Sequence, residues 1–353
     1  MTQGDAAGIG PEIIAKLYQQ APEVVRGCFV VGDVATMRRA CRVVQRPGCP
    51  VLPVVQIQHA AQAMALPPRC LAVLQLGEYG APVPFGRVSA VAGRMAGDCV
   101  VWAAQAALRG EIAGLVTAPL HKEALSAAGA PYSDYPGHTE LLQAQAARHF
   151  GVNAAQMPVR MMLANAELRT VLVSIHVSLR QAIEAVTHDN VLQTLRITHQ
   201  ALQALLGRPP RIAVAGLNPH AGEGGLFGRE ELEVIQPAMA SAQAEGMQLH
   251  GPVAPDTVFM RARQGEFDVV VAMYHDQGLI PVKYLGVEQG VNVTLGLPLV
   301  RTSPDHGTAF DLAGTGRADA NSLIEAVRMA RRLLASRKAG LENDPIGSAT
   351  IIS

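Results

Sequence analysis

The sequence contains few aromatic and few charged residues. Aromatic residues make up 4% of its 353 positions, with one tryptophan, and charged residues make up 16%. Lysine plus arginine number 29, as do aspartate plus glutamate, so the formal net charge is +0. A nucleic-acid-binding surface requires a basic excess or a basic stripe, and this balance argues against one. A few local cations can still hold a small anionic substrate.

Cysteine is also scarce, and its pattern argues against a disulfide-stabilised protein. The five cysteines lie in the first third of the chain, and no CxxC motif occurs. This usage is typical of a reduced, cytoplasmic protein. No apolar run approaches the roughly 20 residues that span a bilayer, and no basic-then-apolar segment opens the chain. We therefore expect a cytoplasmic protein that does not contact membranes.

Hydrophobic residues, at 49%, are abundant enough for a large core. Apolar β-branched runs alternate with helical patterns, which predicts a mostly parallel α/β fold. Helices are expected at Pro11–Gln20, Val34–Val44, Ser89–Leu108, Thr139–Phe150, Leu179–Val186, Asp189–Leu206, Glu230–Glu245 and Asn321–Ser336. Strands are expected at Cys28–Val31, Val51–Ile57, Cys70–Leu76, Ile112–Pro119, Val159–Leu163, Arg169–Ile175, Arg211–Leu217, Val269–Met273 and Val291–Thr294.

Three of these expected strands share one feature, which is a histidine at or just after the carboxyl end. The histidines are His176, His220 and His275, and the last opens the polar segment Tyr274–Gly278. Ligands of α/β proteins collect beyond the carboxyl ends of parallel strands. Three imidazoles delivered to one edge indicate a metal site with open positions for water or substrate. The alternative is three unrelated strand-end histidines, and wide ligand spacing is less specific than a CxxC pair.

Four segments in register carry a resemblance to a known family. They are Gly137–Glu140 (GHTE), Leu217–Gly225 (LNPHAGEGG), Ala272–Gly278 (AMYHDQG) and Gly296–Ala309 (GLPLVRTSPDHGTA). Together they resemble the 4-hydroxythreonine-4-phosphate dehydrogenase family of vitamin B6 biosynthesis, from the first residues to about Arg332. Each motif alone is modest, whereas four in order are specific for the family and less so for the substrate, because the family has paralogues.

The resemblance implies a fold and an assembly. The fold is two α/β domains around a cleft, as in isocitrate and isopropylmalate dehydrogenases, within one enzyme unit over residues 1–353 whose internal boundaries the sequence leaves open. The assembly is a homodimer with its active site at the subunit interface. The family has an apolar strand before the strand-to-helix turn of Met1–Glu12, and proline where this chain has Ala6. That strand is expected to be nearly absent here, either because the start codon is placed too late or because an edge strand is lost. Lys338–Ser353 is expected to be a loosely held tail.

The resemblance also assigns the metal ligands and the groups beside them. His176, His220 and His275 match the family's metal-binding histidines; zinc is favoured, with magnesium or cobalt as alternatives. Asp276 is either a carboxylate that orients His275 and handles protons, or simply the cap of a turn. Lys283 is a candidate catalytic residue that would stabilise an enolate. The general base remains open among Asp276, Lys283 and a metal-bound hydroxide.

The resemblance also implies which residues contact the substrate and the cofactor. The substrate-binding positions are His138, Thr139, Lys283, Asn292 and Arg301, although Thr139 alone predicts only a helix cap and each cation alone only a side chain reaching solvent. The nucleotide loop is Asp305–Gly316, which is similar to the loop of isocitrate and isopropylmalate dehydrogenases. Its candidate contacts are Asp305, His306, Gly307, Thr308 and Asp311. No arginine cluster marks a 2′-phosphate, so NAD is favoured over NADP.

The function implied is NAD-dependent oxidation and decarboxylation of 4-phosphooxy-L-threonine to 3-amino-2-oxopropyl phosphate, in pyridoxal phosphate synthesis. The nearest alternative is a paralogue that oxidises D-threonate or D-erythronate 4-phosphate. A relative that oxidises an aromatic cis-dihydrodiol is disfavoured, because an unphosphorylated substrate would not need both Gly137–Glu140 and Arg301. From other classes, the alternatives are a catalytically silent metal- or nucleotide-binding protein and a transport-type binding protein.

Overall fold

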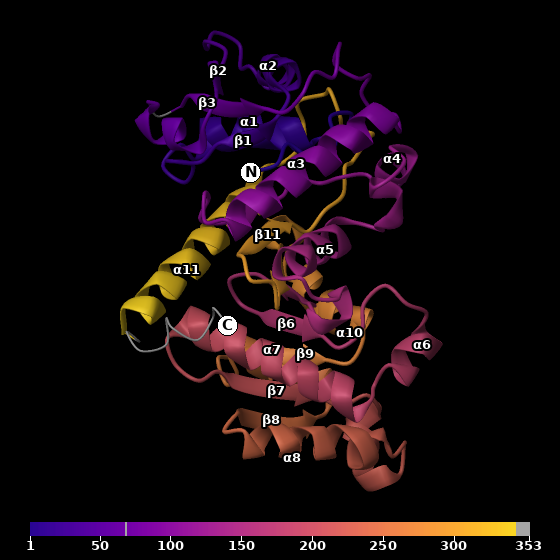
Figure 1. Cartoon of the computed structure of the whole chain (residues 1–353). Coiled ribbons are helices and arrows are strands. Elements are labelled where there is room, and N and C mark those ends of the chain that lie inside the picture. The colour runs from indigo at the N-terminus through magenta and orange to yellow at the C-terminus, as the bar shows by residue number, and fades with distance from the viewer. Residues whose placement is uncertain (68, 344–353) are drawn as a thin grey trace. The chain divides into compact units, whose positions relative to one another are not determined.

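The computed structural model describes residues 1–67 and 69–343, which divide into two α/β units (Figure 1). The first unit contains Met1–Pro158 and Leu297–Ala330, and the second contains Val159–Gly296 and the described residues from Arg331 to Asn343. The units are therefore interleaved in sequence. The α/β class with mostly parallel strands is confirmed by the pairings of both units.

The first unit holds its strands in two groups. Its elements are α1 (Gly10–Gln20), β1 (Val30–Gly32), α2 (Val34–Val43), β2 (Val54–Ile57), β3 (Leu71–Gln75), α3 (Ala90–Leu108), β4 (Leu115–Val116), α4 (Lys122–Ala127), α5 (His138–Phe150) and β11 (Arg301–Pro304). Strands β1, β3 and β2 form a parallel sheet in that order, and β4 pairs in parallel with β11. Cys99 of α3 packs against Phe29, Val31, Ala72 and Leu74, so this helix covers the sheet of β1, β3 and β2.

The first residues of the chain take a strand position that the sequence did not predict. Thr2 forms parallel bridges to both Val31 and Thr117, and its amide donates to Val116 O at 3.0 Å. Thr2 and Gln3 are fully buried. The expectation of a lost edge strand was wrong in its placement, because these residues lie between β1 and β4.

The second unit is built on a longer sheet. Its strands run in the order β10 (Val291–Leu295), β5 (Arg160–Ala164), β6 (Arg169–Leu172), β9 (Val269–Ala272), β7 (Arg211–Ala215) and β8 (Gln248–Val253). The pairs β10–β5 and β5–β6 are antiparallel, as predicted for β5 and β6, and the remaining pairs are parallel. All residues of β9 are fully buried, which is why this strand is apolar throughout rather than alternating.

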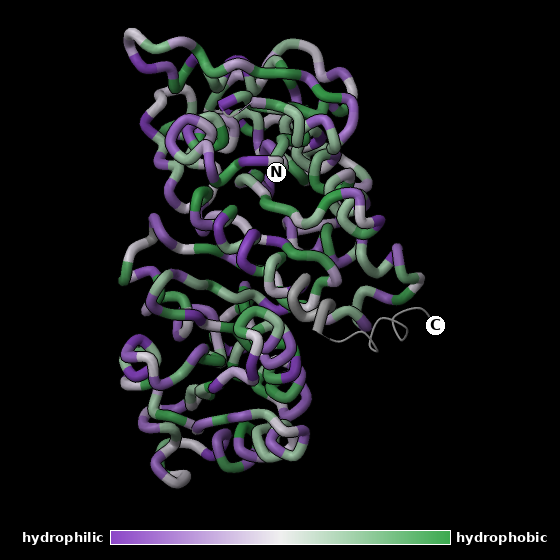
Figure 2. The backbone as a smooth tube through the Cα atoms, turned by 90° about the vertical axis from the view of Figure 1, so that its left-hand side faces the viewer, coloured by the Kyte–Doolittle hydropathy of each residue, from purple (hydrophilic) through white to green (hydrophobic). Residues whose placement is uncertain are grey.

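Helices cover both faces of this sheet. Helices α9 (Pro255–Arg263) and α10 (His275–Tyr284) contribute Val258, Leu279 and Val282 to a core with Val270 and Ala272. Helix α7 (His188–Leu206) contacts β5 and β6, and α8 (Gln236–Ala244) contacts β8. Hydrophilic and hydrophobic residues alternate along the helical turns in Figure 2, as expected for helices with one buried side.

Several elements differ from the sequence expectations. Strand β8, helix α9, helix α10 and strand β11 were not predicted, and the expected strand Ile112–Pro119 shortens to β4. A proline inside α10, Pro281, hid that helix, because proline removes a backbone donor. Helix α11 spans Asn321–Asn343, so the expected tail is helical up to Asn343, and its remainder lies outside the described residues. In residues 1–67 and 69–343 no helix is long and apolar enough to cross a membrane.

Candidate functional site

The second unit brings the three predicted histidine ligands to adjacent strand ends. Strands β6, β9 and β7 are parallel neighbours, and each is followed by one of these histidines. His176 follows β6, and His275 is the first residue of α10, which begins three residues after the end of β9. Their ring centroids lie 5.5 Å apart with an angle of 46° between the planes. The sheet order therefore supplies the proximity that the sequence could only suggest.

His275 is oriented by the carboxylate beside it. Its Nδ1 lies 2.7 Å from Asp276 Oδ1, and the Asp276 side chain is 69% exposed. No side-chain cap hydrogen bond is present at the start of α10. This geometry agrees with an orienting role for Asp276 and does not support a helix-capping one. With Nδ1 occupied by the carboxylate, Nε2 is the ring nitrogen left to bind a ligand.

His220 lies on an unusual backbone segment after β7. His220, Ala221, Gly222, Glu223 and Gly224 all have positive φ values, between 44° and 78°. Such a run is costly for non-glycine residues and marks functional loops. His220 Nδ1 lies 3.2 Å from Glu223 Oε2, and its side chain is 62% exposed. The contact again leaves Nε2 available.

The structure does not assemble the three histidines into a finished metal site. Across the described part of the chain, no group of three or more His, Cys, Asp or Glu side chains is placed to hold a metal ion. His176 and His275 are brought together, while the His220 ring instead lies near Phe227, with centroids 6.1 Å apart. The chemistry of the donors still fits a divalent metal, since His220 and His275 each pair Nδ1 with a carboxylate. The three-histidine site stays a prediction.

Two further predicted residues of the second unit have different environments. Lys283 lies in the last turn of α10 and is half-buried. Asn292 lies on β10, opposite Leu163 of β5, and is also half-buried. The sequence placed Lys283 after an apolar run, whereas it belongs to the helix that begins at His275. One helix therefore carries His275, Asp276 and Lys283.

The first unit contains a cationic site at the start of α5. Arg301, the first residue of β11, is 4% exposed and donates Nε and Nη2 to Thr117 Oγ1 at 3.2 and 2.8 Å. Burial lowers the pKa of Arg301 to about 10, and the nearby Glu140 carboxylate opposes that shift. The alternative weighed for Arg301 alone, a side chain that reaches solvent, does not hold, because β11 buries the residue. Thr117, which orients the guanidinium, was not among the predicted site residues.

His138 lies beside this arginine. The His138 ring is half-buried, and its Nε2 atom is enclosed without a hydrogen-bond partner. Burial, and then the Arg301 charge, hold the pKa of His138 well below its usual value. Both effects favour the neutral form of the imidazole. Thr139 lies in the first turn of α5 and Gly137 occupies the cap position, so the alternative that Thr139 only caps the helix does not hold.

These groups together can bind an anion. A helix N-terminus directs backbone N–H groups and a partial positive charge outward, and α5 begins at His138. Arg301 adds a buried cation, and the enclosed Nε2 of His138 adds an unsatisfied polar atom. A carboxylate or phosphate would complement this arrangement.

The predicted nucleotide loop is anchored to the first unit by its backbone. Thr308 is 7% exposed, and its carbonyl accepts a hydrogen bond from Ile9 N at 3.0 Å. Asp305 and His306 are half-buried, and Gly307 and Asp311 are exposed. A Cβ at Gly307 would meet nothing within 4 Å, so this part of the loop is open to a ligand.

Glu12, on α1, forms hydrogen bonds with the backbone of two glycines at the far end of the same loop. The buried carboxylate accepts the backbone N–H of Gly316 at 3.1 Å and that of Gly314. The ring of Phe310 stacks on His121 at 4.6 Å and 13°. Gly314 and Gly316 therefore serve to fix the loop. The sequence placed Glu12 only within a helix.

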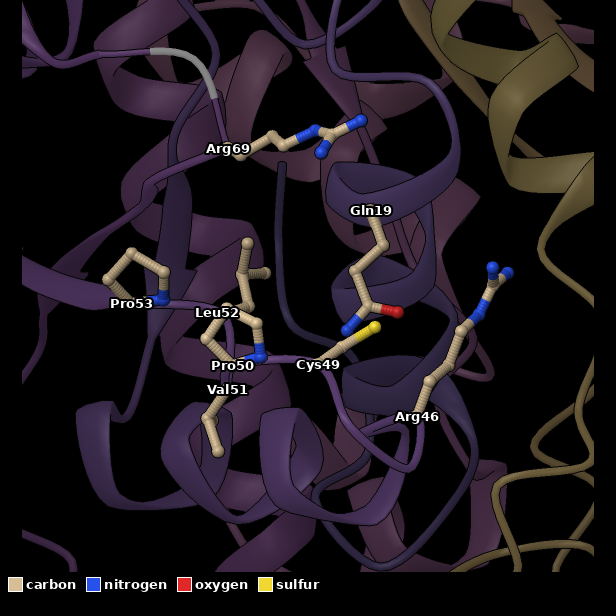
Figure 3. A pocket seen from close by; sticks show the side chains of 8 residues that line it. All are labelled: Gln19, Arg46, Cys49, Pro50, Val51, Leu52, Pro53 and Arg69. Carbon is tan, nitrogen blue, oxygen red and sulfur yellow. The ribbon is translucent and has the colours of Figure 1, made fainter.

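A separate cavity of about 270 Å³ lies elsewhere in the first unit. Figure 3 shows Gln19, Arg46, Cys49, Val51 and Arg69 among its lining residues, together with Pro50, Leu52 and Pro53. None of these belongs to the predicted catalytic, metal or substrate set. This cavity thus does not mark the predicted chemistry.

Fold and site together define an α/β protein whose polar residues collect where parallel strands end. Residues 25–330 match the family model described as "Pyridoxal phosphate biosynthetic protein PdxA". The chain belongs to this family.

Named relatives support membership of the same family. A 4-hydroxythreonine-4-phosphate dehydrogenase of Beijerinckia indica is 53% identical over 94% of each chain. A D-threonate 4-phosphate dehydrogenase of Salmonella typhimurium is 42% identical over 94% of this chain and 98% of that one. A crystal structure of 4-hydroxythreonine-4-phosphate dehydrogenase from Klebsiella pneumoniae matches with a TM-score of 0.82 and 40% identity, over 94% of this chain and 98% of that one.

Proposed function

We propose that the protein is a dehydrogenase that oxidises and decarboxylates 4-phosphooxy-L-threonine with NAD. Family membership and the Beijerinckia relative support this substrate class. The observation that carries the proposal is the buried Arg301 guanidinium, held by Thr117, together with the helix N-terminus at His138. That arrangement suits a phosphorylated anion, which would contact the Arg301 guanidinium and the helix N-terminus. The Thr139 hydroxyl would donate a further hydrogen bond to the same phosphate.

The reaction balances without a further reactant. The C3 hydroxyl loses its proton, and the C3 hydride passes to the nicotinamide ring of NAD. The resulting β-keto acid releases carbon dioxide, and the enolate that remains takes up one proton at C2. The products are 3-amino-2-oxopropyl phosphate, carbon dioxide and NADH. Lys283 would stabilise the enolate as a compact cation, and Asn292 would bind the substrate.

We propose His176, His220 and His275 as ligands of a divalent metal, with zinc favoured and magnesium or cobalt as alternatives. When bound, such an ion acts as a Lewis acid on the substrate hydroxyl and on the ketone it becomes. Asp276 would keep the His275 ring oriented and could relay the hydroxyl proton, since its carboxylate is largely exposed. The paired Nδ1 atoms of His220 and His275 support this assignment.

NAD would be held by the loop from Asp305 to Asp311. The Thr308 carbonyl fixes the loop to the residues before α1, and Gly307 leaves room for the cofactor. His306 and Thr308 would contact the dinucleotide through polar atoms. NADP remains the alternative, and relative affinity for the two cofactors distinguishes them.

A homodimer is supported by exposed apolar side chains next to the histidines. Val177 and Leu179 follow His176, Leu226 follows His220, and Ile280 and Tyr284 lie on the helix of His275; all are 50–90% exposed. Isolated exposed apolar residues are common, but several beside one site indicate an interface. We propose that a second copy covers them and that the active site lies at this interface.

The test is NADH formation by the purified protein with each of two substrates. Fast turnover of 4-phosphooxy-L-threonine that is lost with EDTA and restored by metal is the expected result. Faster turnover of D-threonate 4-phosphate would instead favour the function named for the Salmonella relative, and would move the protein to sugar-acid catabolism. Turnover of neither substrate by a folded, metal-loaded protein would overturn the proposal in favour of a silent binding protein.

A further inference from the structure

A primary amide ties together two of the strands that carry the histidines. Gln277 Oε1 accepts the backbone N–H of Met273 at 2.7 Å, and its Nε2 donates to the carbonyl of Gly216 at 2.8 Å. Met273 directly follows β9, and Gly216 directly follows β7. Gln277 itself lies two residues after His275, in the first turn of α10. One side chain therefore joins the segments that lead to His275 and His220.

A buried hydroxyl extends this connection to the third strand. Ser174 Oγ donates to the carbonyl of Met273 at 3.0 Å, and both residues are almost fully buried. Ser174 lies between the end of β6 and His176. The backbone of Met273 is thus held from both sides, by Ser174 at its carbonyl and by Gln277 at its amide. The ends of β6, β9 and β7 are cross-linked by side chains at the points where parallel-strand pairing stops.

A buried carboxylate fixes the left-handed loop of His220. Glu231 is 1% exposed, and its Oε1 accepts the backbone N–H groups of Leu217 and Asn218 at 2.8 and 2.7 Å. Its Oε2 accepts Asn218 Nδ2 at 3.0 Å. A Cβ added at Gly222 would approach Glu231 Oε2 to 2.7 Å, so the loop folds directly over this carboxylate.

The left-handed run needs such an anchor. Three non-glycine residues in this conformation cost free energy that surrounding contacts must offset. Glu231 also opens a single π-helical turn, Glu231–Ile235, a distortion found often at functional sites. The anchor and the distortion occur at the same residue.

We propose that Gln277, Ser174 and Glu231 are positioning residues that hold the three histidine-bearing segments in a geometry competent to bind a divalent cation. The inference rests on the metal site of the proposed function and goes beyond it, because these residues contact backbone rather than ligand. A glutamate at position 277 would turn an oxygen toward the Gly216 carbonyl, where the amide now donates. Local repulsion would then separate the β7 and β9 ends without changing side-chain size.

The experiment compares metal binding by Gln277→Glu and by the wild type, each in the metal-free form, using Co²⁺ titrated calorimetrically and followed by its visible absorption. We expect affinity to fall on the order of 10- to 100-fold, as for other residues that support metal ligands, with an altered Co²⁺ spectrum. Gln243→Glu, an exposed position on α8, adds the same charge to the same unit and should leave both readouts unchanged.

Milder and independent variants keep the test decisive if Gln277→Glu fails to fold. Ser174→Ala removes only the contact to Met273, and Glu231→Gln retains an acceptor for the two loop amides; each should weaken Co²⁺ binding several-fold. Folded variants that bind Co²⁺ like the wild type would overturn the positioning role while the metal site stands. A wild type that binds no Co²⁺ or Zn²⁺ would overturn both, and loss of thermal stability with unchanged affinity would show a purely structural role.

Discussion

At the scale of single residues, Arg301 shows how burial changes a functional group. The side chain is almost completely enclosed, yet its pKa remains about 10, so it stays charged at neutral pH. Thr117 takes two of its donors, which fixes the plane of the guanidinium. A guanidinium whose plane is fixed in advance suits bidentate contact with an anion.

Replacement of Arg301 by lysine should therefore damage substrate binding while keeping the charge. Arg301→Lys loses the planar fork, and kcat/KM for the phosphorylated substrate should fall roughly 10- to 100-fold, since charged hydrogen bonds contribute about 1.5–3 kcal/mol. Steady-state kinetics measures the effect. Arg196→Lys, an exposed ion pair on α7, is the control and should change little. An unchanged kcat/KM in Arg301→Lys would remove this residue from the substrate site.

The lowered pKa of His138 predicts that the stability of the protein depends on pH. Burial and Arg301 lower its pKa in the folded state, so the unfolded chain binds the proton more readily. The folded state is therefore unaffected above the unfolded pKa of about 6.5 and loses stability as pH falls below it. Urea unfolding of the wild type and of His138→Gln at pH values across this range should show a smaller loss in the variant. Parallel curves for the two proteins would contradict the assigned shift.

At the scale of elements, α10 carries several functional groups against the sheet. Gly278 allows a close approach to β6 and β9, because a Cβ there would lie 2.5 Å from Leu172 Cδ2 and 3.0 Å from Ala272 Cβ. Gly278→Ala should push the helix away from β9 and destabilise the protein by about 1–3 kcal/mol. Chemical unfolding measures this. Gly307→Ala is the matched control for unfolding, because its Cβ would meet nothing within 4 Å.

The nucleotide loop is held in place by Glu12 of helix α1. Glu12→Gln keeps one acceptor oxygen and puts an amide donor opposite a loop N–H, so either Gly314 or Gly316 loses its acceptor. We expect unfolding free energy to fall by about 1–3 kcal/mol and NADH to bind more weakly. Fluorescence titration of NADH tests the second part, with the exposed Glu23→Gln as control. Full NADH affinity in a destabilised variant would limit Glu12 to a structural role.

At the scale of the whole molecule, the proposed dimer depends on the exposed apolar side chains near the histidines. Leu179, at the start of α6 (Leu179–Glu184), is 61% exposed. Leu179→Glu should shift the protein from dimer to monomer, as measured by light scattering, and lower activity with it. Met64→Glu alters a more exposed apolar residue in the first unit and should not dissociate the dimer. A monomeric wild type would contradict the assembly.

The sequence by itself determined most of the strands and helices, and the chemical identity of the candidate site. Apolar runs and helical periodicity are local properties, so Val269–Ala272, Arg211–Ala215 and Ala90–Leu108 were found close to their true bounds. The four motifs were sufficient to indicate the family, because they preserve residue types in order along the chain. Helix α10 was missed for a local reason, because proline normally ends a helix and Pro281 lies inside this one.

Only the tertiary structure decided which distant residues act together. Thr117 and Arg301 are 184 positions apart, and Glu12 and Gly314 are 302 apart, so no local pattern connects them. The same holds for the Gln277 amide, which reaches Gly216 only because β7 and β9 are neighbours in the sheet. Such contacts depend on strand order and burial, which arise from the packing of the whole core rather than from any segment. The same packing buries Arg301, a predicted substrate-binding cation whose burial no local pattern indicates.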